Sequence, residues 1–196
     1  MWAERYGFHV LAPALPGFAG SPTVALAEYR PTRLAHIVVD ALAVRGIARF
    51  SLVGYSWGGS IGVRIDPQQL DALVLLDVGY QTYDEMPTLE QRLEEFSDAD
   101  FADPVIVATA FHGVDVEPPV EMLPRLASSG LDVLLLAATE PHVERRAADL
   151  ARFREVLPKA EVVEIDGGEH NLLHTRPAET IAAVGDWLRA VTMARA

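Results

Sequence analysis

Short apolar runs alternate with amphipathic segments along most of the chain. The runs have the length and composition of buried strands: 8–12, 50–53, 72–76, 132–137 and 161–165. The segments at 31–45, 142–157 and from Pro177 onward place apolar residues at helical spacing. Because strands that alternate with helices form parallel sheets, the pattern predicts an α/β fold, an open parallel sheet flanked by helices.

Residues 79–130 break this alternation. The segment holds several prolines, a polar helix candidate at 89–96 and an apolar stretch at 105–111. We interpret 79–130 as a short lid or cap insertion within a single domain, 1–196. Four large apolar residues of the lid could face a substrate, although a small core of the lid itself is the favoured interpretation: Phe96, Phe101, Phe111 and Met122.

The most specific local pattern is the sequence Gly-Tyr-Ser-Trp-Gly-Gly at 54–59. It follows the strand candidate at 50–53 and precedes a helix-compatible run. Glycines allow a sharp strand-to-helix turn in which chain segments pass closely, and such a turn raises the Ser56 hydroxyl above the edge of the sheet. The pattern therefore indicates a nucleophile elbow, the alternative being an ordinary glycine-rich turn.

Polar residues follow several of the strand candidates. Ser56, Glu140 and His170 each come just after one, in this order along the chain, and Asp77 ends another. In open parallel sheets, ligands bind beyond the carboxyl ends of the strands, so these side chains are expected near one another. The order serine, acid, histidine is that of an α/β-hydrolase triad.

Taken together, these segments resemble the α/β-hydrolase superfamily. The resemblance rests on residues 10–18, 54–59, 73–77 and 167–170, and it extends over essentially the whole chain. It implies nucleophilic acyl transfer through a serine, as in esterases, with no cofactor. No nucleotide, flavin or metal signature is found, and the pair His170 and His174 lacks the glutamate of the zinc-protease motif.

The resemblance implies a catalytic role for each polar residue. Ser56 would attack the substrate, His170 would take and return its proton, and Glu140 would orient the imidazole. Asp77 remains a rival acid. Glu140 is preferred because an aspartate at the position of Asp77 is common in the superfamily without a catalytic role.

The residues beside Ser56 are expected to complete the site. The backbone N–H of Trp57 would stabilise the oxyanion of the reaction. The side chains of Tyr55 and Trp57 would line an acyl pocket, or would pack against neighbouring strands. His170 could also be an uninvolved loop histidine, and Glu140 a solvated carboxylate before Pro141.

The resemblance begins late, at the superfamily's fourth core strand. An earlier strand and a His-Gly-type loop, which supplies half of the oxyanion hole, have no counterpart before Phe8, so the fold is expected to be N-terminally truncated. Losing one oxyanion donor costs roughly 100–1000-fold in rate. An unpaired buried edge costs about 1–3 kcal/mol per orphaned backbone group. Residues 8–12 would therefore pair directly with 50–53, or a second copy or complementing chain would fill the gap, or the chain would fold poorly.

Composition excludes several classes of function. Half of the 196 residues are apolar and 22% are charged, as in ordinary globular proteins. The net charge of −12 argues against nucleic-acid partners. No apolar run approaches the roughly 20 residues that span a membrane, and the first residues do not form a secretory signal. Cysteine is absent. A small-molecule substrate and a cytoplasmic location are expected.

Three functions are compatible with these patterns. The favoured one is a serine hydrolase acting on a small ester, amide or related carbonyl substrate. A non-catalytic or incomplete hydrolase-fold protein with a binding or assembly role is the first alternative. The second is a cofactor-free, non-hydrolytic enzyme that uses the same pocket, with His170 as its base.

Overall fold

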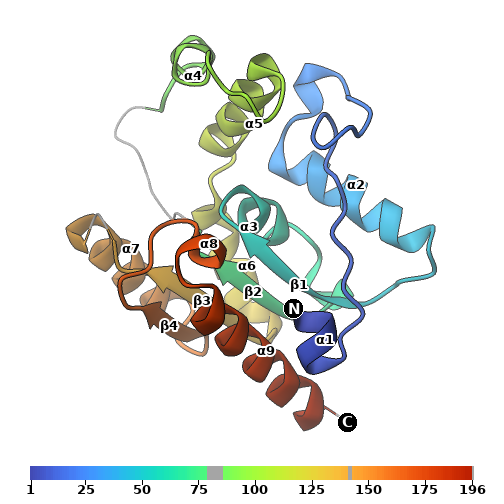
Figure 1. Cartoon of the computed structure of the whole chain (residues 1–196), viewed down its shortest axis with the longest axis vertical. Coiled ribbons are helices and arrows are strands. Elements are labelled where there is room, and N and C mark those ends of the chain that lie inside the picture. Colours follow the sequence, from blue (N-terminus) through green and yellow to red (C-terminus); the bar gives the residue numbers. More distant parts are fainter. Residues whose placement is uncertain (79–85, 141–142, 196) are drawn as a thin grey trace.

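The computed structural model describes residues 1–78, 86–140 and 143–195 (Figure 1). Its centre is a parallel sheet of four strands in the order β1-β2-β3-β4. The strands are β1 (Phe50–Tyr55), β2 (Leu70–Leu76), β3 (Val133–Ala138) and β4 (Glu161–Ile165). The predicted α/β fold with a parallel sheet is confirmed, and these strands begin and end within two residues of the predicted runs.

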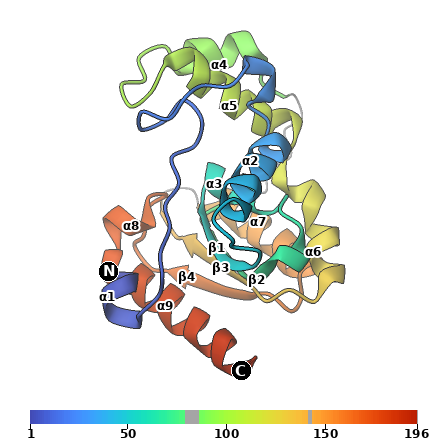
Figure 2. The ribbon, with the colours of Figure 1, turned by 90° about the vertical axis from the view of Figure 1, so that its right-hand side faces the viewer.

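Helices cover both faces of the sheet, as Figure 2 shows from the side. The first face packs against α2 (Pro31–Ala43), α3 (Trp57–Gly62), α6 (Leu123–Ser129) and α7 (Val143–Val156). The second face packs against α1 (Trp2–Tyr6), α8 (Leu172–Thr175) and α9 (Pro177–Ala194). Short 3-10 helices lie at η1 (Leu26–Glu28), η2 (Pro67–Gln69) and η3 (Pro119–Met122).

Burial on both faces of the sheet explains the apolar runs in the two central strands, β2 and β3. In β2, Leu73 and Leu75 point into the core on the first face, whereas Val74 and Leu76 point into the core on the second. Successive strand residues alternate between faces, and both faces are buried from Ala72 to Leu76, so the one polar residue of β2 is Asp71, near its start. Every residue of β3 is buried for the same reason.

The predicted strand at 8–12 is wrong. These residues form neither helix nor strand, and Val10 and Leu11 remain 47% and 40% exposed. A strand is stabilised by pairing, and apolar composition alone does not supply a partner. Among the residues described, β1 pairs with β2 and lies at the edge of the sheet. Direct pairing of 8–12 with β1 is therefore excluded, and a complementing strand there stays a prediction.

The cap, residues 86–118, lies beyond the carboxyl ends of the strands (Figure 1). It contains α4 (Leu89–Glu95) and α5 (Pro104–Val116). Thr88 caps α4, because its hydroxyl accepts a hydrogen bond from the Gln91 N–H. The following α6 packs its Leu123 and Leu126 into the core on the first face of the sheet.

Candidate active site

Ser56 occupies a strained turn between β1 and α3. Its backbone has φ 48° and ψ −112°, a region that residues with a side chain rarely adopt. The Ser56 N–H donates to the Leu76 carbonyl at 3.0 Å, which ties the turn to the end of β2. This is the geometry expected of a nucleophile elbow.

The glycines around Ser56 make the turn possible. A Cβ on Gly54 would lie 2.7 Å from the Gly59 Cα and 2.8 Å from the Gly58 carbonyl oxygen. A Cβ on Gly59 would lie 2.1 Å from a methyl group of Val78. The strand and the helix therefore pass each other at a separation that leaves no room for side chains at these two positions.

His170 bridges Ser56 and an acid. Its Nε2 lies 2.9 Å from the Ser56 Oγ, and its Nδ1 lies 2.7 Å from an Asp77 carboxylate oxygen. With the Nδ1 proton donated to the carboxylate, Nε2 is free to accept from the hydroxyl of Ser56. The three side chains form one continuous chain of hydrogen bonds.

Asp77 is held firmly at the end of β2. Its side chain is 7% exposed, and its backbone has a left-handed φ of 46°. The other carboxylate oxygen accepts from the Ala138 N–H at 2.9 Å, which fixes the carboxylate against the end of β3. A buried carboxylate with such donors is stabilised as the anion that the imidazole needs.

The structure does not place Glu140 in this chain. Glu140 is exposed, and its backbone N–H, rather than its carboxylate, supports the histidine loop by donating to the Gly168 carbonyl at 2.9 Å. The geometry therefore brings Asp77, and not the preferred Glu140, to His170, and which carboxylate serves the reaction stays a prediction. The order of the strands does not account for this difference, because β3, which precedes Glu140, lies beside β4, which precedes His170. The Asp77 carboxylate reaches the imidazole, whereas the Glu140 side chain is exposed.

The neighbours of Ser56 have separate positions. Trp57 is the first residue of α3. It lines the pocket described below and also packs against the core on the first face of the sheet. Tyr55 does not line that pocket. Its ring packs on the imidazole of His170, with ring centroids 5.1 Å apart. Burial, and secondarily the charge of Asp77, raises the pKa of the Tyr55 hydroxyl.

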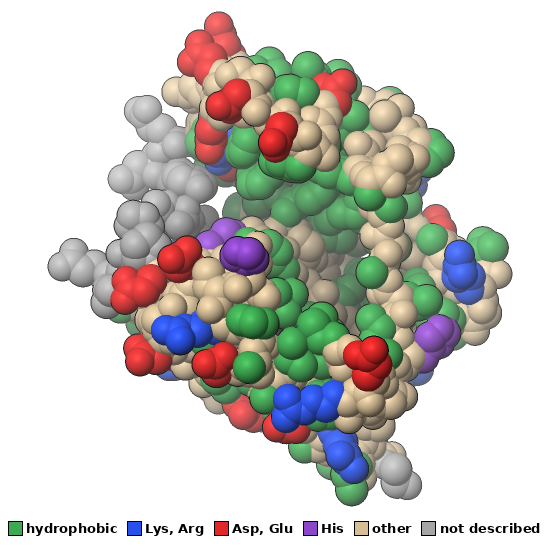
Figure 3. All heavy atoms as spheres, viewed as in Figure 1, with side chains coloured by type: hydrophobic (Ala, Val, Ile, Leu, Met, Phe, Trp, Pro, Cys, Tyr) green, Lys and Arg blue, Asp and Glu red, His purple; other side chains and the backbone are tan. Residues whose placement is uncertain are grey.

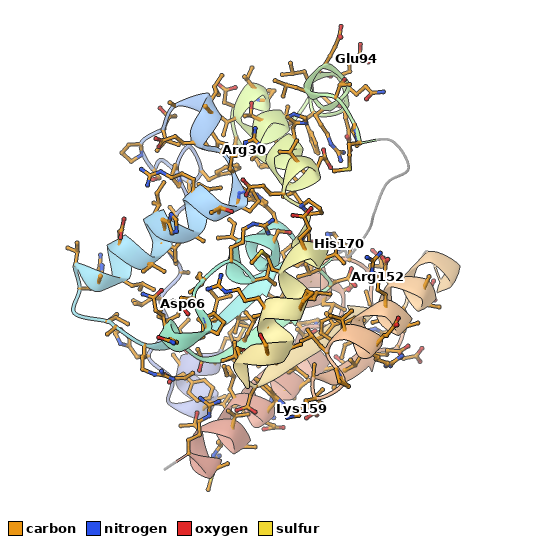
Figure 4. The ribbon with its side chains drawn as sticks, turned by 180° about the vertical axis from the view of Figure 1, so that it is seen from behind. Arg30, Asp66, Glu94, Arg152, Lys159 and His170 are labelled. Atoms are coloured by element: carbon orange, nitrogen blue, oxygen red, sulfur yellow. The ribbon has the colours of Figure 1, made fainter. Side chains whose placement is uncertain are left out.

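A pocket of about 260 Å³ opens between Ser56 and the cap. Figure 3 shows the molecule hollowed between the cap and the body, with hydrophobic side chains in the hollow, and Figure 4 labels His170 between these two parts. The lining includes Ser56 and His170. The remaining lining residues are Trp57, Ser60, Met86, Arg92, Phe111, Val114, Asp115, Pro118 and Pro119.

The cap contributes an ion pair that the sequence did not indicate. Arg92 donates from Nε and Nη2 to both carboxylate oxygens of Asp115, each at 2.6 Å. The two side chains are 11% and 4% exposed. Hydrogen bonds to Asp115 raise the pKa of Arg92. The two residues lie on different helices and share no sequence motif, so no local signal pairs them.

The four apolar lid candidates separate into different environments. Phe111 lines the pocket. Phe96 packs on Phe111 with ring centroids 4.5 Å apart, as in a small core of the cap. Phe101 is 64% exposed, and Met122 packs against the core on the first face of the sheet. One of the four therefore faces the pocket.

Two further features bear on the kind of protein. Within the described ranges, no three His, Asp or Glu side chains gather in a way that could hold a metal ion. The helices of those same ranges include none that is long and apolar enough to cross a lipid bilayer.

A parallel sheet with a strained serine turn and a histidine at its carboxyl edge defines an α/β enzyme of the hydrolase class. The sequence model of the alpha/beta hydrolase family matches residues 1–184. The chain belongs to this family and is a hydrolase. No curated protein sequence matches it significantly.

Solved structures share the fold at low sequence identity. An esterase from Thermogutta terrifontis is 20% identical, with a TM-score of 0.76 over 97% of this chain and 84% of the other. An N-acyl homoserine lactonase is 17% identical, with a TM-score of 0.68 over the same shares of the two chains. A putative epoxide hydrolase from Pseudomonas aeruginosa is 19% identical, with a TM-score of 0.66 over 92% and 79%.

Proposed function

We propose that the protein is a serine hydrolase that cleaves a small ester, amide or related carbonyl substrate through Ser56, His170 and Asp77. The observation that carries this proposal is the unbroken chain of hydrogen bonds from the Ser56 hydroxyl through the imidazole to the buried Asp77 carboxylate. The esterase and the lactonase among the structural neighbours are consistent with this chemistry on the same fold.

The reaction follows from the positions of the protons. His170 takes the proton of Ser56 at Nε2 as the oxygen attacks the substrate carbonyl, and Asp77 stabilises the imidazolium that results. The imidazolium returns the proton to the leaving group, which departs and leaves an acyl group on Ser56. Water, activated by the same imidazole, then releases the acid and restores the serine.

The start of α3 supplies one donor for the oxyanion. The N–H of Trp57 directly follows the nucleophile and comes before the first hydrogen-bonded turn of the helix, so it can donate to a developing negative charge. The pocket is small, at about 260 Å³, and is walled largely by apolar side chains. These features favour a substrate that places an apolar group against Ser56.

Labelling with a fluorophosphonate tests the proposal. Purified protein whose fold is verified by circular dichroism is treated with the probe, and its intact mass is measured beside that of Ser56→Ala. The expected result is a single adduct on the wild type and none on the variant, because phosphonylation needs an activated serine.

Two results would contradict the proposal. A folded wild type without an adduct would indicate that Ser56 is not activated, as in a binding protein on the same fold. Substrate turnover that survives Ser56→Ala but is lost in His170→Ala would instead indicate the non-hydrolytic alternative, in which the imidazole is the base.

A further inference from the structure

His170 depends on few contacts for its position. Its side chain is 51% exposed, and it lies on the loop between β4 and α8. Two hydrogen bonds, to Ser56 and Asp77, define where its ring nitrogens lie. An exposed loop histidine has rotamer freedom to lose, so a further contact on its ring face would matter.

The Tyr55 ring supplies that contact. The two rings lie 5.1 Å apart at an interplanar angle of 45°, within the range of favourable aromatic packing. Tyr55 ends β1, in the residue directly before the nucleophile. The same rigid strand end therefore carries the serine and a ring that faces its base.

The ring of Tyr55, rather than its hydroxyl, makes the contact. Within the part of the chain that the structure describes, the hydroxyl has no hydrogen-bond partner, although it is not enclosed. Burial and the charge of Asp77 raise its pKa, so the phenol stays neutral wherever His170 acts as a base. The residue thus presents a neutral aromatic face to the imidazole.

We propose that Tyr55 is a positioning residue, whose ring holds the imidazole of His170 between Ser56 and Asp77 and favours the imidazolium formed when the serine proton is taken. The face of an aromatic ring is negative and attracts a cation within about 6 Å. The role in catalysis rests on the proposed function, whereas the positioning of the ring does not.

Apart from Asp77, the charged groups described near His170 do not contact its imidazole, so we assign the positioning role to the ring of Tyr55. The carboxylate in contact with the imidazole is that of Asp77. On the cap side of the pocket, the charges of Arg92 and Asp115 neutralise each other. Glu140, two residues after the end of β3, contacts the histidine loop through its backbone N–H.

The test compares Tyr55→Phe with Tyr55→Leu by proton NMR. The His170 Nδ1 proton, donated to Asp77, gives a downfield resonance that is assigned by its loss in His170→Ala. We expect it to stay sharp in the wild type and in Tyr55→Phe. It should broaden in Tyr55→Leu, because the Nδ1 proton of the less constrained imidazole exchanges faster with water. Phe18→Leu is the matched control, since its ring packs on Trp57 and not on His170.

Kinetics supply the second readout. We expect kcat to fall roughly 10–100-fold in Tyr55→Leu with little change in KM, and to stay within about 2-fold in Tyr55→Phe, because misplacement of a base slows chemistry more than binding. Tyr55→Met, which is also non-aromatic, replaces the leucine variant if circular dichroism shows that the latter does not fold.

The NMR result separates this inference from the proposed function. A resonance that is equally sharp in Tyr55→Leu, or absent from the wild type, would overturn the positioning role whether or not the protein turns over a substrate. A resonance that broadens as expected in a protein that no fluorophosphonate labels would support the positioning role and contradict the hydrolase proposal.

Discussion

The carboxyl end of the sheet is held by the backbone, whereas the cap is held by side chains. At the sheet end, Ser56 and Asp77 both have left-handed backbone conformations, and their N–H groups donate to the neighbouring strands. In the cap, the bond between Arg92 and Asp115 joins α4 to α5. The ring contact between Phe96 and Phe111 joins the same helices.

We infer from this difference that the sheet end governs the rate of the reaction, whereas the cap governs which substrate is accepted. Backbone hydrogen bonds between parallel strands hold the attached side chains in precise positions. The hydrogen bonds from Ser56 to His170 and from His170 to Asp77 require such precision. Side-chain contacts in the cap can change one at a time while the sheet persists. Substitutions at the sheet end should therefore act on kcat or on folding, and substitutions in the cap on local stability and on the choice of substrate.

The largest expected effect separates the two candidate acids. Asp77→Asn should lower kcat by about 10⁴-fold, because an amide cannot stabilise the imidazolium and favours the wrong tautomer of His170. Glu140→Gln should change kcat by less than about 2-fold, since that carboxylate is exposed and does not contact the imidazole. Steady-state kinetics on a 4-nitrophenyl ester measures both. The reverse order of the two losses would restore Glu140 as the acid.

The same comparison shows how much of the fold the sequence predicts. The runs in β2 and β3 are apolar throughout because both faces of these strands are buried, and that burial makes them recognisable without a structure. The run at 8–12 has similar residues but no partner strand, and a local pattern does not record whether a partner exists. Composition therefore predicts central strands better than segments outside the sheet.

The site is predictable to the extent that it depends on local backbone. The turn at Ser56 follows from the glycines around it, and the placement of His170 follows from the position of its loop after the last strand. The choice between Asp77 and Glu140 depends on which carboxylate reaches His170 in the folded chain, a long-range property, since Asp77 and His170 are 93 positions apart. The pairing of Arg92 with Asp115 is likewise long-range, and two charged residues 23 positions apart carry no joint signal.

Substitution of the glycines tests whether the close approach of β1 and α3 stabilises the sheet end. Gly54→Ala should lower the free energy of unfolding by about 3 kcal/mol, because the added Cβ would lie 2.7 Å from the Gly59 Cα. Gly58→Ala is the matched control: a Cβ there meets nothing within 4 Å, and alanine favours a helix. Urea unfolding measures both variants. Equal stabilities for the two would show that the turn can relax.

Removal of the ion pair between Arg92 and Asp115 tests whether side-chain contacts stabilise the cap. Arg92→Leu should destabilise the cap by about 2 kcal/mol, because it leaves Asp115 buried without its cation. The loss should appear as faster hydrogen exchange in α4 and α5, with the strands unchanged. Arg154→Leu removes an exposed pair with Glu164 and should cost less than about 0.5 kcal/mol.

A double variant shows whether the buried charge is the cause. Arg92→Leu combined with Asp115→Leu should recover part of the lost protection, since no buried unpaired charge remains. Glu95, which also loses its contact with Arg92, is exposed. If exchange instead accelerates equally in the strands and in the cap helices, the cap is not a separately stabilised part of the molecule.

The smallest expected effect is on stability at alkaline pH, where Tyr55 at the sheet end loses its proton and Arg92 in the cap keeps its charge. The pKa of Tyr55 is raised by burial and by Asp77, so the folded state holds the phenol proton more tightly than the unfolded state does. This contribution to stability is complete below the unfolded tyrosine pKa of about 10, and it is lost as the pH rises from there through the folded pKa. Arg92 in the cap, whose pKa is also raised, stays charged over the same range. Urea unfolding at about pH 9 and pH 11 should therefore show a larger loss for the wild type than for Tyr55→Phe. Equal losses of stability in the wild type and in Tyr55→Phe would indicate that water reaches the Tyr55 hydroxyl freely. The phenol would then be less buried than the contacts of Tyr55 imply.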